Sequence, residues 1–183
     1  MPTETTVPLF SVEPLPGYEP TIGRWLWVLE DTRREMKEEA LTGLLPAALD
    51  WTPPHSENSI GTVLYHIGLI ELDWLYTEVL ESQPWPEELK PLFALNDRDA
   101  QGRLSSLRGE TLEEHLHRLD LVRQYLLAAF QGMTLEEFRR PHLFSQYRVT
   151  AEWVLQHLIQ HEGEHRGQIQ LLRSLAEGAL SAR

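Results

Sequence analysis

Apolar residues recur three and four positions apart in four stretches of the chain, which is the spacing of one face of an α-helix. In the first stretch the recurring positions are Ile22, Trp25, Leu26, Leu29, Arg33 and Met36. We therefore expect long amphipathic helices over about residues 21–45, 59–81, 111–132 and 151–177.

Capping residues and prolines define the ends of these helices. Asn58 or Ser59 can cap the second helix, and Thr150 can cap the last. Thr111 and Glu114 have the spacing of a capping box at the start of the third. Prolines between residues 84 and 91 end the second helix, so residues 87–109 are predicted to form a long connection with one short helix. Strand signals are nearly absent, and only residues 147–149 suggest a short extended piece.

Four apolar stripes are buried most simply in a four-helix bundle, so the predicted fold is all-α. Residues 1–19 carry four prolines and almost no periodicity, which predicts an extended N-terminal arm. Residues 20–183 are expected to form the bundle itself.

Composition excludes several kinds of chemistry. The 183 residues suit one domain, and the chain contains no cysteine, so it has no thiolate metal site, disulfide or cysteine nucleophile. The net charge of −12 argues against binding to nucleic acid or anionic membrane surfaces. The N-terminus lacks the features of a signal peptide, and no stretch approaches the ~20 apolar residues of a membrane span. We expect a soluble cytoplasmic protein.

The last predicted helix carries three histidines, His157, His161 and His165. Histidines four residues apart lie on one helical face and can reach one metal ion. His161 and His165 occupy two positions of the apolar stripe. His157 lies on the flank of that stripe, where a hydrogen bond that is structural or that supports a metal ligand is expected rather than metal ligation. Burying an unpartnered imidazole costs on the order of 1–3 kcal/mol, and a metal ion would compensate that cost.

A third candidate ligand is His66, on the inward stripe of the second predicted helix. Catalytic metal sites usually combine three protein ligands with an open position. The alternative is that these are core histidines bonded to backbone or carboxylate groups. The remaining histidines fit a site poorly, because two adjoin prolines in loops and two belong to the edge and polar side of the third helix. They are His55, His142, His115 and His117.

Sequence motifs alone would also allow two other classes of metal site, that of a metalloprotease and that of a di-iron bundle. Residues 161–165 match H-E-x-x-H, in which the glutamate is the general base of a metalloprotease. Few residues follow His165 and a substrate-binding sheet is not predicted, so we instead expect Glu162 to pair with Arg166 on the solvent side. A di-iron bundle would use Glu114 with His117 and Glu162 with His165, but His117 is predicted to face solvent.

Two segments resemble the DinB-like superfamily of damage-inducible-type proteins. The first is N-S-I-G-T-V-L-Y-H-I-G at residues 58–68, followed by Glu71 and Trp74-Leu75. The second runs from Trp153 to Ile169 and contains H-E-G-E-H-R-G-Q-I. The resemblance covers about residues 20–176. It implies a DinB/YfiT-type four-helix bundle with up-down-down-up topology and a long connection between helices two and three, often as a homodimer.

The resemblance also implies a function. It implies a divalent metal ion, nickel or zinc, held by His66, His161 and His165, and a reaction of the S-transferase type with a low-molecular-weight thiol and a small electrophilic substrate. Because the chain has no cysteine, the sulfur nucleophile must come from a cosubstrate. Arg166 is a candidate substrate-binding residue, and no catalytic residue is assigned. The alternatives are a non-catalytic metal-binding stress-response protein or a metal-dependent hydrolase.

Overall fold

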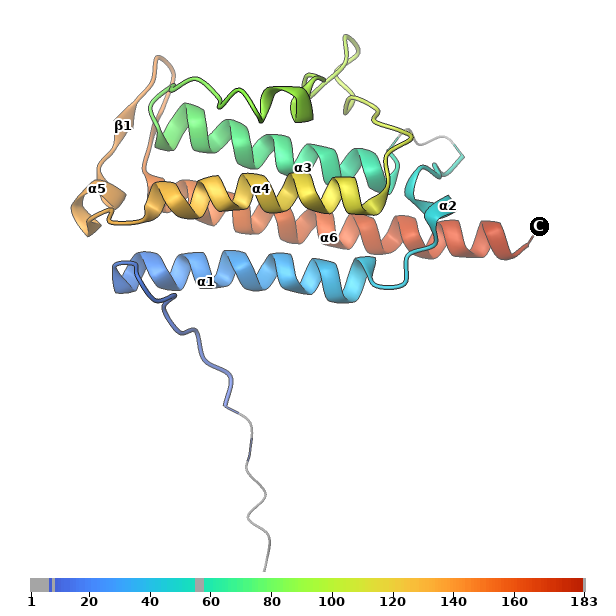
Figure 1. Cartoon of the computed structure of the whole chain (residues 1–183), viewed down its shortest axis with the longest axis horizontal. Helices are drawn as coiled ribbons and strands as arrows, with labels where there is room; N and C mark the ends of the chain where they lie inside the picture. The colour runs from blue at the N-terminus through green and yellow to red at the C-terminus, as the bar shows by residue number, and fades with distance from the viewer. Residues whose placement is uncertain (1–6, 8, 55–57, 183) are drawn as a thin grey trace, which may run out of the picture.

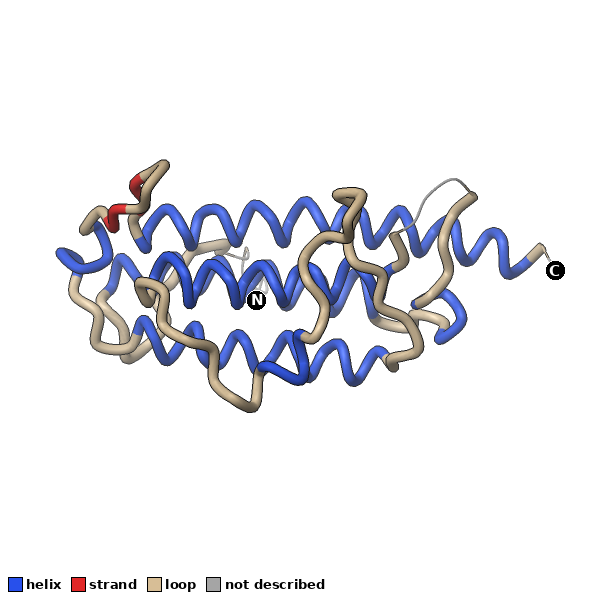
Figure 2. The backbone as a smooth tube through the Cα atoms, turned by 90° about the horizontal axis from the view of Figure 1, so that it is seen from above, coloured by secondary structure: helices blue, strands red, loops and turns tan. Residues whose placement is uncertain are grey.

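The computed structural model describes residues 7, 9–54 and 58–182. Four long helical segments lie side by side along most of its length (Figure 1; Figure 2). They are α1 (Pro20–Glu35) continued by the π-helical turn η1 (Met36–Leu41), α3 (Ile60–Trp74) continued by η2 (Leu75–Val79), α4 (Leu112–Phe130) and α6 (Ala151–Ser181). The predicted all-α class is confirmed.

Short elements connect the long helices. They are α2 (Pro46–Leu49), the 3₁₀ turn η3 (Lys90–Phe93), α5 (Leu135–Arg139) and the strands β1 (His142–Leu143) and β2 (Arg148–Val149). The two strands form an antiparallel hairpin in which His142 pairs with Val149. This hairpin lies at the opposite end of the bundle from the C-terminus (Figure 2).

The direction of the chain explains its long central connection. In Figure 1, α1 and α6 run from left to right, whereas α3 and α4 run from right to left. Because α3 and α4 point the same way, the chain must return along the bundle between them, and residues 80–111 do so with only the short turn η3 as helix. The packing of α6 against both α1 and α3 is what positions the candidate site described below.

Local signals in the sequence predicted most helix ends. Ser59 Oγ accepts a hydrogen bond from the Thr62 amide, and Thr150 Oγ1 accepts one from the Trp153 amide. The capping box of Thr111 and Glu114 is present. The first helix was predicted too long, because the helical segment ends at Leu41 and the chain turns at Gly43, where φ is +72°. Neither α5 nor β1 was predicted.

A buried ionic cluster joins the four long helices at mid-length. It consists of Arg33 on α1, Glu71 on α3, Arg123 on α4 and Glu162 on α6, which are all almost fully buried. Arg33 donates hydrogen bonds to both carboxylates, and Arg123 also donates to both. The buried apolar residues form two groups, and on α1 and α6 the ionic cluster lies between them. Leu29 and Leu158 belong to the first group, and Met36 and Ile169 belong to the second.

The prediction that Glu162 pairs with Arg166 on the solvent side is wrong, because Glu162 belongs to the ionic cluster. Its side chain is only 1% exposed and is bound by Arg33 and Arg123, so it does not pair with Arg166 on the solvent side. Arg166 pairs with Glu35 on α1 instead. Burial alone would raise the pKa of Glu71, but Arg123 and Arg33 together hold that pKa below its usual value. The cluster contains equal numbers of opposite charges, which is the condition under which buried ions are tolerated.

His115 is also not where the sequence suggested. It is 1% exposed instead of lying at the polar edge of its helix, and its Nδ1 accepts a hydrogen bond from Arg118. Its Nε2 has no hydrogen-bond partner within the described residues and faces Gly61. Burial lowers the pKa of His115 to about 4; Arg118 acts in the same direction, and Glu110 and Asp50 oppose it.

This buried imidazole should make the fold sensitive to acid. The unfolded chain has the higher histidine pKa, so it takes up a proton first and the free energy of unfolding falls as pH drops from about 6.5 to about 4. The full contribution is about 3 kcal/mol. We expect His115→Phe to flatten the pH dependence of urea unfolding over this range. His117→Phe, at an exposed position on the same helix, should keep the wild-type slope. Equal slopes in wild type and His115→Phe would contradict the prediction.

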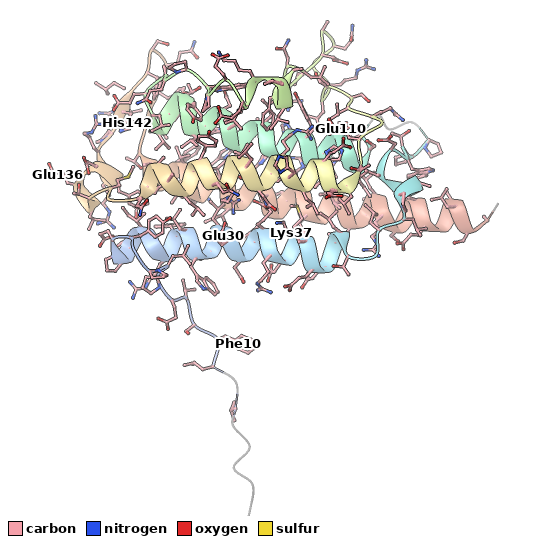
Figure 3. The ribbon with its side chains drawn as sticks, in the orientation of Figure 1. Phe10, Glu30, Lys37, Glu110, Glu136 and His142 are labelled. Carbon is pink, nitrogen blue, oxygen red and sulfur yellow. The ribbon has the colours of Figure 1, made fainter. Side chains whose placement is uncertain are left out.

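The residues before α1 have no regular secondary structure where they are described. Phe10 lies on a segment that leads away from the bundle and is almost fully exposed (Figure 3). The division into an arm of residues 1–19 and a bundle of residues 20–183 stays a prediction, and residues 1–6 and 8 lie outside the described residues, as does His55. No described helix combines the length and apolar character needed to cross a membrane.

Candidate metal centre

Three histidines from two helices meet between α3 and α6. His66 lies at mid-length of α3, and His161 and His165 lie one turn apart on α6. The Nε2 atoms of His66 and His161 are 3.1 Å apart. The imidazole centroid of His66 is 5.0 Å from those of both His161 and His165. The structure therefore brings together the three residues that the sequence singled out.

Hydrogen bonds fix the orientation of two of these rings. Nδ1 of His66 lies 2.6 Å from Oδ1 of Asp97, and Nδ1 of His165 lies 2.8 Å from Oε1 of Gln168. Because carboxylate and amide oxygens accept hydrogen bonds, each Nδ1 carries the proton. Nε2 of His66 and of His165 then carries the lone pair that a metal ion would use, and a carboxylate on the far nitrogen is the usual partner of a metal-bound histidine.

The environment favours neutral imidazoles. Burial lowers the pKa of His66, although Asp97 opposes the shift. Burial, together with the neighbouring His165 and His66, lowers the pKa of His161 to about 3. A neutral imidazole is the form that binds a metal ion, so these two rings are in the ligand state at neutral pH.

The donor set fits a divalent transition metal. Imidazole nitrogens held tetrahedrally at about 2.0–2.1 Å from a zinc ion lie roughly 3.3 Å apart. The Nε2 atoms of His66 and His161 are close to that spacing, and one ligand atom from each of the three histidines lies within 4.8 Å of the others. Imidazole is a suitable ligand for both zinc and nickel, so the chemistry does not choose between them.

A polar pocket opens beside the three histidines. Its volume is about 430 Å³. Besides the three histidines, its lining includes the polar residues Asp97, Arg98 and Gln168 and the rings of Trp74 and His157. There is space for a small molecule next to the imidazoles, which a closed structural metal site would not need.

The other described histidines considered in the sequence do not belong to the three-histidine group. His157 packs its ring against Trp74 and Trp153 at centroid distances of 4.6 and 5.2 Å. His117 is exposed, as predicted, and Glu114 caps α4, so they do not join a di-iron site. His142 was expected in a loop but is buried in β1, where its Nδ1 contacts the Glu78 carbonyl oxygen at 2.6 Å.

The structure also argues against the metalloprotease interpretation of residues 161–165. A zincin requires its glutamate to face the metal-bound water. Glu162 instead points into the bundle core, where Arg33 and Arg123 bind both of its carboxylate oxygens. The glutamate of the H-E-x-x-H motif therefore has a structural role in this chain.

Sequence reasoning missed the hydrogen-bond partners of the candidate ligand histidines. Asp97 and Arg98 come from the long connection, where no periodicity or motif signals a function. Gln168 had a usable signal, because it lies three residues after His165 on the same helix and is part of the quoted H-R-G-Q run. Arg166, the predicted substrate-binding residue, contacts Glu35, and its role in binding a substrate stays a prediction.

Loss of Asp97 should weaken metal binding without removing it. Outer partners of ligand histidines typically contribute about 10–100-fold to metal affinity, because they fix the tautomer and the ring. We expect this decrease for Asp97→Ala in a zinc titration by calorimetry. Glu87→Ala, at an exposed site of the same connection, should bind zinc like the wild type. Equal affinities of Asp97→Ala and wild type would show that the carboxylate does not support the site.

Fold and site together define a class, a helical bundle with a three-histidine candidate metal site between two of its helices. A family model described as the DinB superfamily matches residues 29–169, which is most of the chain. The chain belongs to the DinB superfamily, and the resemblance drawn from the sequence is confirmed. No curated protein matches it.

Proposed function

We propose that this protein is a metal-dependent enzyme that uses a low-molecular-weight thiol in an S-transferase reaction. The observation that carries the proposal is the convergence of His66, His161 and His165 on one point at the edge of a pocket with space for small molecules. Nickel or zinc is the proposed ion. Held by neutral imidazoles, it would keep its full positive charge and lower the pKa of a thiol that approaches it.

The chain's own residues would prepare the site for this chemistry. Asp97 and Gln168 hold His66 and His165 in the tautomer that presents Nε2, and Arg98 places a cation at the pocket wall for an acidic group of the thiol. In the reaction, the thiol sulfur forms a bond with an electrophilic carbon. The bond from that carbon to the leaving group breaks, the leaving group takes the electron pair, and the thiol proton passes to solvent. The sulfur must come from a cosubstrate, because the chain has no cysteine.

The competing proposal is a non-catalytic metal-binding protein. Such a role needs a closed coordination sphere, whereas the three histidines here border a pocket of about 430 Å³. This space beside the imidazoles favours the enzyme. The DinB-like resemblance also makes a cytoplasmic homodimer the expected state, which analytical ultracentrifugation and cell fractionation would test.

The test is an activity assay in which each of several thiols is combined with each of several electrophiles. Metal-loaded protein is incubated with bacillithiol, mycothiol or glutathione and a panel of electrophiles, and the thioether product is measured by mass spectrometry. The control is a variant with all three histidines replaced by alanine. Product formation that depends on the histidines supports the enzyme. If the protein binds about one ion per chain but forms no product with any pair, the binding-protein alternative is favoured.

A further inference from the structure

A second cavity lies next to the metal pocket along the groove between α3 and α6. Its volume is about 650 Å³, and its walls are mostly apolar. It is lined by Trp74 at the end of α3, Trp153 near the start of α6, and, from the hairpin region, Pro141 and residues 147–150. Nothing in the proposed metal chemistry accounts for this cavity.

Two rows of side chains connect the cavity with the histidines. Residues four apart on a helix share one face, so each row follows one side of the groove. The row on α3 and η2 is His66, Ile70, Trp74 and Glu78, and the row on α6 is Trp153, His157, His161 and His165. Each row therefore links a candidate ligand histidine to a tryptophan that lines the apolar cavity, Trp74 on α3 and Trp153 on α6.

Aromatic rings form a continuous wall between the two spaces. Trp74 lines both the metal pocket and the apolar cavity. Its ring lies 5.3 Å from Trp153 and 4.6 Å from His157, and Trp153 stacks on His157 with an angle of 6° between their planes. A molecule in the apolar cavity therefore lies against the same indole that borders the three histidines.

A partly buried hydrogen bond ties the hairpin to the end of the α3 segment. Tyr147, which lines the cavity, donates its hydroxyl proton to Oε1 of Glu78 at 2.6 Å. Glu78 is almost fully buried, and its other oxygen, Oε2, has no partner within the described residues. Because the Tyr147 proton is used in this bond, its oxygen can only accept a hydrogen bond from a ligand. His142 also holds the hairpin by contacting the Glu78 carbonyl oxygen.

The lining indicates the shape of the ligand. Indole and phenol faces prefer offset-stacked or edge-to-face contacts with other aromatic rings. Two tryptophans and a tyrosine around one cavity are therefore suited to a flat ring. A cavity of about 650 Å³ is also within the range of small-molecule sites. The polar pocket around the histidines, by contrast, has Asp97, Arg98 and Gln168 on its walls.

We propose that the apolar cavity binds the aromatic body of the electrophilic substrate, while the polar pocket takes the thiol. This inference rests on the proposed S-transfer, and it assigns the substrate class as aromatic electrophiles whose reactive carbon lies at the Trp74 end. Trp74 and Trp153 are the binding residues. Tyr147 is a positioning residue, since its bond to Glu78 holds the hairpin residues that line the cavity.

The first test measures binding without any chemistry. Metal-free full-length protein is titrated with N-phenyl-1-naphthylamine, an uncharged aromatic fluorophore. We expect saturable binding that weakens at least about tenfold in Trp153→Ala and in Trp74→Ala, because stacked aromatic contacts and their buried area are lost. Trp153 is 47% exposed, so its replacement should leave the fold intact. Leu143→Ala is the matched control, since Leu143 belongs to the same hairpin, is 77% exposed and does not line the cavity.

The second test separates this inference from the proposed function. With metal-loaded enzyme, Trp153→Ala should raise KM for an aromatic electrophile about tenfold and leave KM for the thiol and for a small alkyl electrophile unchanged. If the fluorophore binds as expected but no thiol pair reacts, the cavity is retained as an aromatic-ligand site and the S-transferase proposal fails. Wild-type fluorophore affinity in both tryptophan variants would overturn the inference.

Discussion

His161→Ala is expected to abolish the binding of nickel or zinc at concentrations at which the wild-type chain binds about one ion. His161 is central to the candidate site, because its Nε2 is 3.1 Å from that of His66 and its ring centroid is 4.4 Å from that of His165. Losing only an outer partner of a ligand costs about 10–100-fold in affinity, so losing a ligand should cost at least about 100-fold. Equilibrium dialysis with elemental analysis measures the bound metal.

His117→Ala is the matched control for the metal experiment. It removes an imidazole from the exposed face of α4, so it should retain the wild-type metal content. Circular dichroism should be the same for both variants and the wild type, because neither substitution touches the ionic cluster or the apolar core. Equal metal content in His161→Ala and wild type would reject the three-histidine site, and with it the proposed function.

Arg123→Met is expected to cause the largest loss of stability. Arg123 donates hydrogen bonds to Glu71, Glu162 and the Leu29 carbonyl oxygen, all of them buried. The substitution would leave two buried carboxylates with Arg33 as their shared cation. Removing one partner from a buried ionic group typically costs about 3–5 kcal/mol, a large part of the stability of a domain of this size. The free energy of unfolding in guanidinium chloride measures the effect.

Two further variants test whether charge is the cause. Arg34→Met removes an exposed arginine of α1 that pairs with Asp31 and Glu38, and exposed pairs contribute about 0–1 kcal/mol. The double variant Arg123→Met/Glu71→Leu should recover part of the lost stability, because it restores equal numbers of charges. A loss below about 1 kcal/mol in Arg123→Met would show that the cluster does not hold the helices together.

The ionic cluster also matters for the candidate metal centre. Glu162 follows His161 directly on α6, and Glu71 lies five residues after His66 on α3. Because Arg33 and Arg123 bind both carboxylates, they tie α6 to α3 next to the histidines. A fixed distance between these two helices is what a site shared between them requires.

The helical periodicity of the sequence was sufficient to predict the long helices and to identify three candidate metal ligands. His161 and His165 were found because two imidazoles at ligand spacing interrupt an apolar stripe, and His66 because it does the same on another helix. The spacing of the apolar face also placed Arg33 among inward positions, and the structure buries it there. Glu162 was misplaced, because a glutamate four residues before an arginine has the same local pattern on an exposed or a buried face.

Residues in the long connection could not be predicted. Asp97 has no local signal, since it reaches His66 only after the chain has returned along the bundle, and such a contact depends on the packing of distant segments. The hydrogen bond between Tyr147 and Glu78 also depends on distant packing, because it joins the hairpin to the end of the α3 segment.

The local pattern of side chains was thus enough to specify the helices, their caps and the imidazoles on their inner faces, because these depend on neighbours within one or two turns. Packing of distant segments decided which carboxylate orients His66, where the charge of Glu162 is neutralised and that an aromatic cavity adjoins the histidines. Each of these depends on contacts between residues far apart in the sequence, which form only when the four helices and the hairpin are assembled.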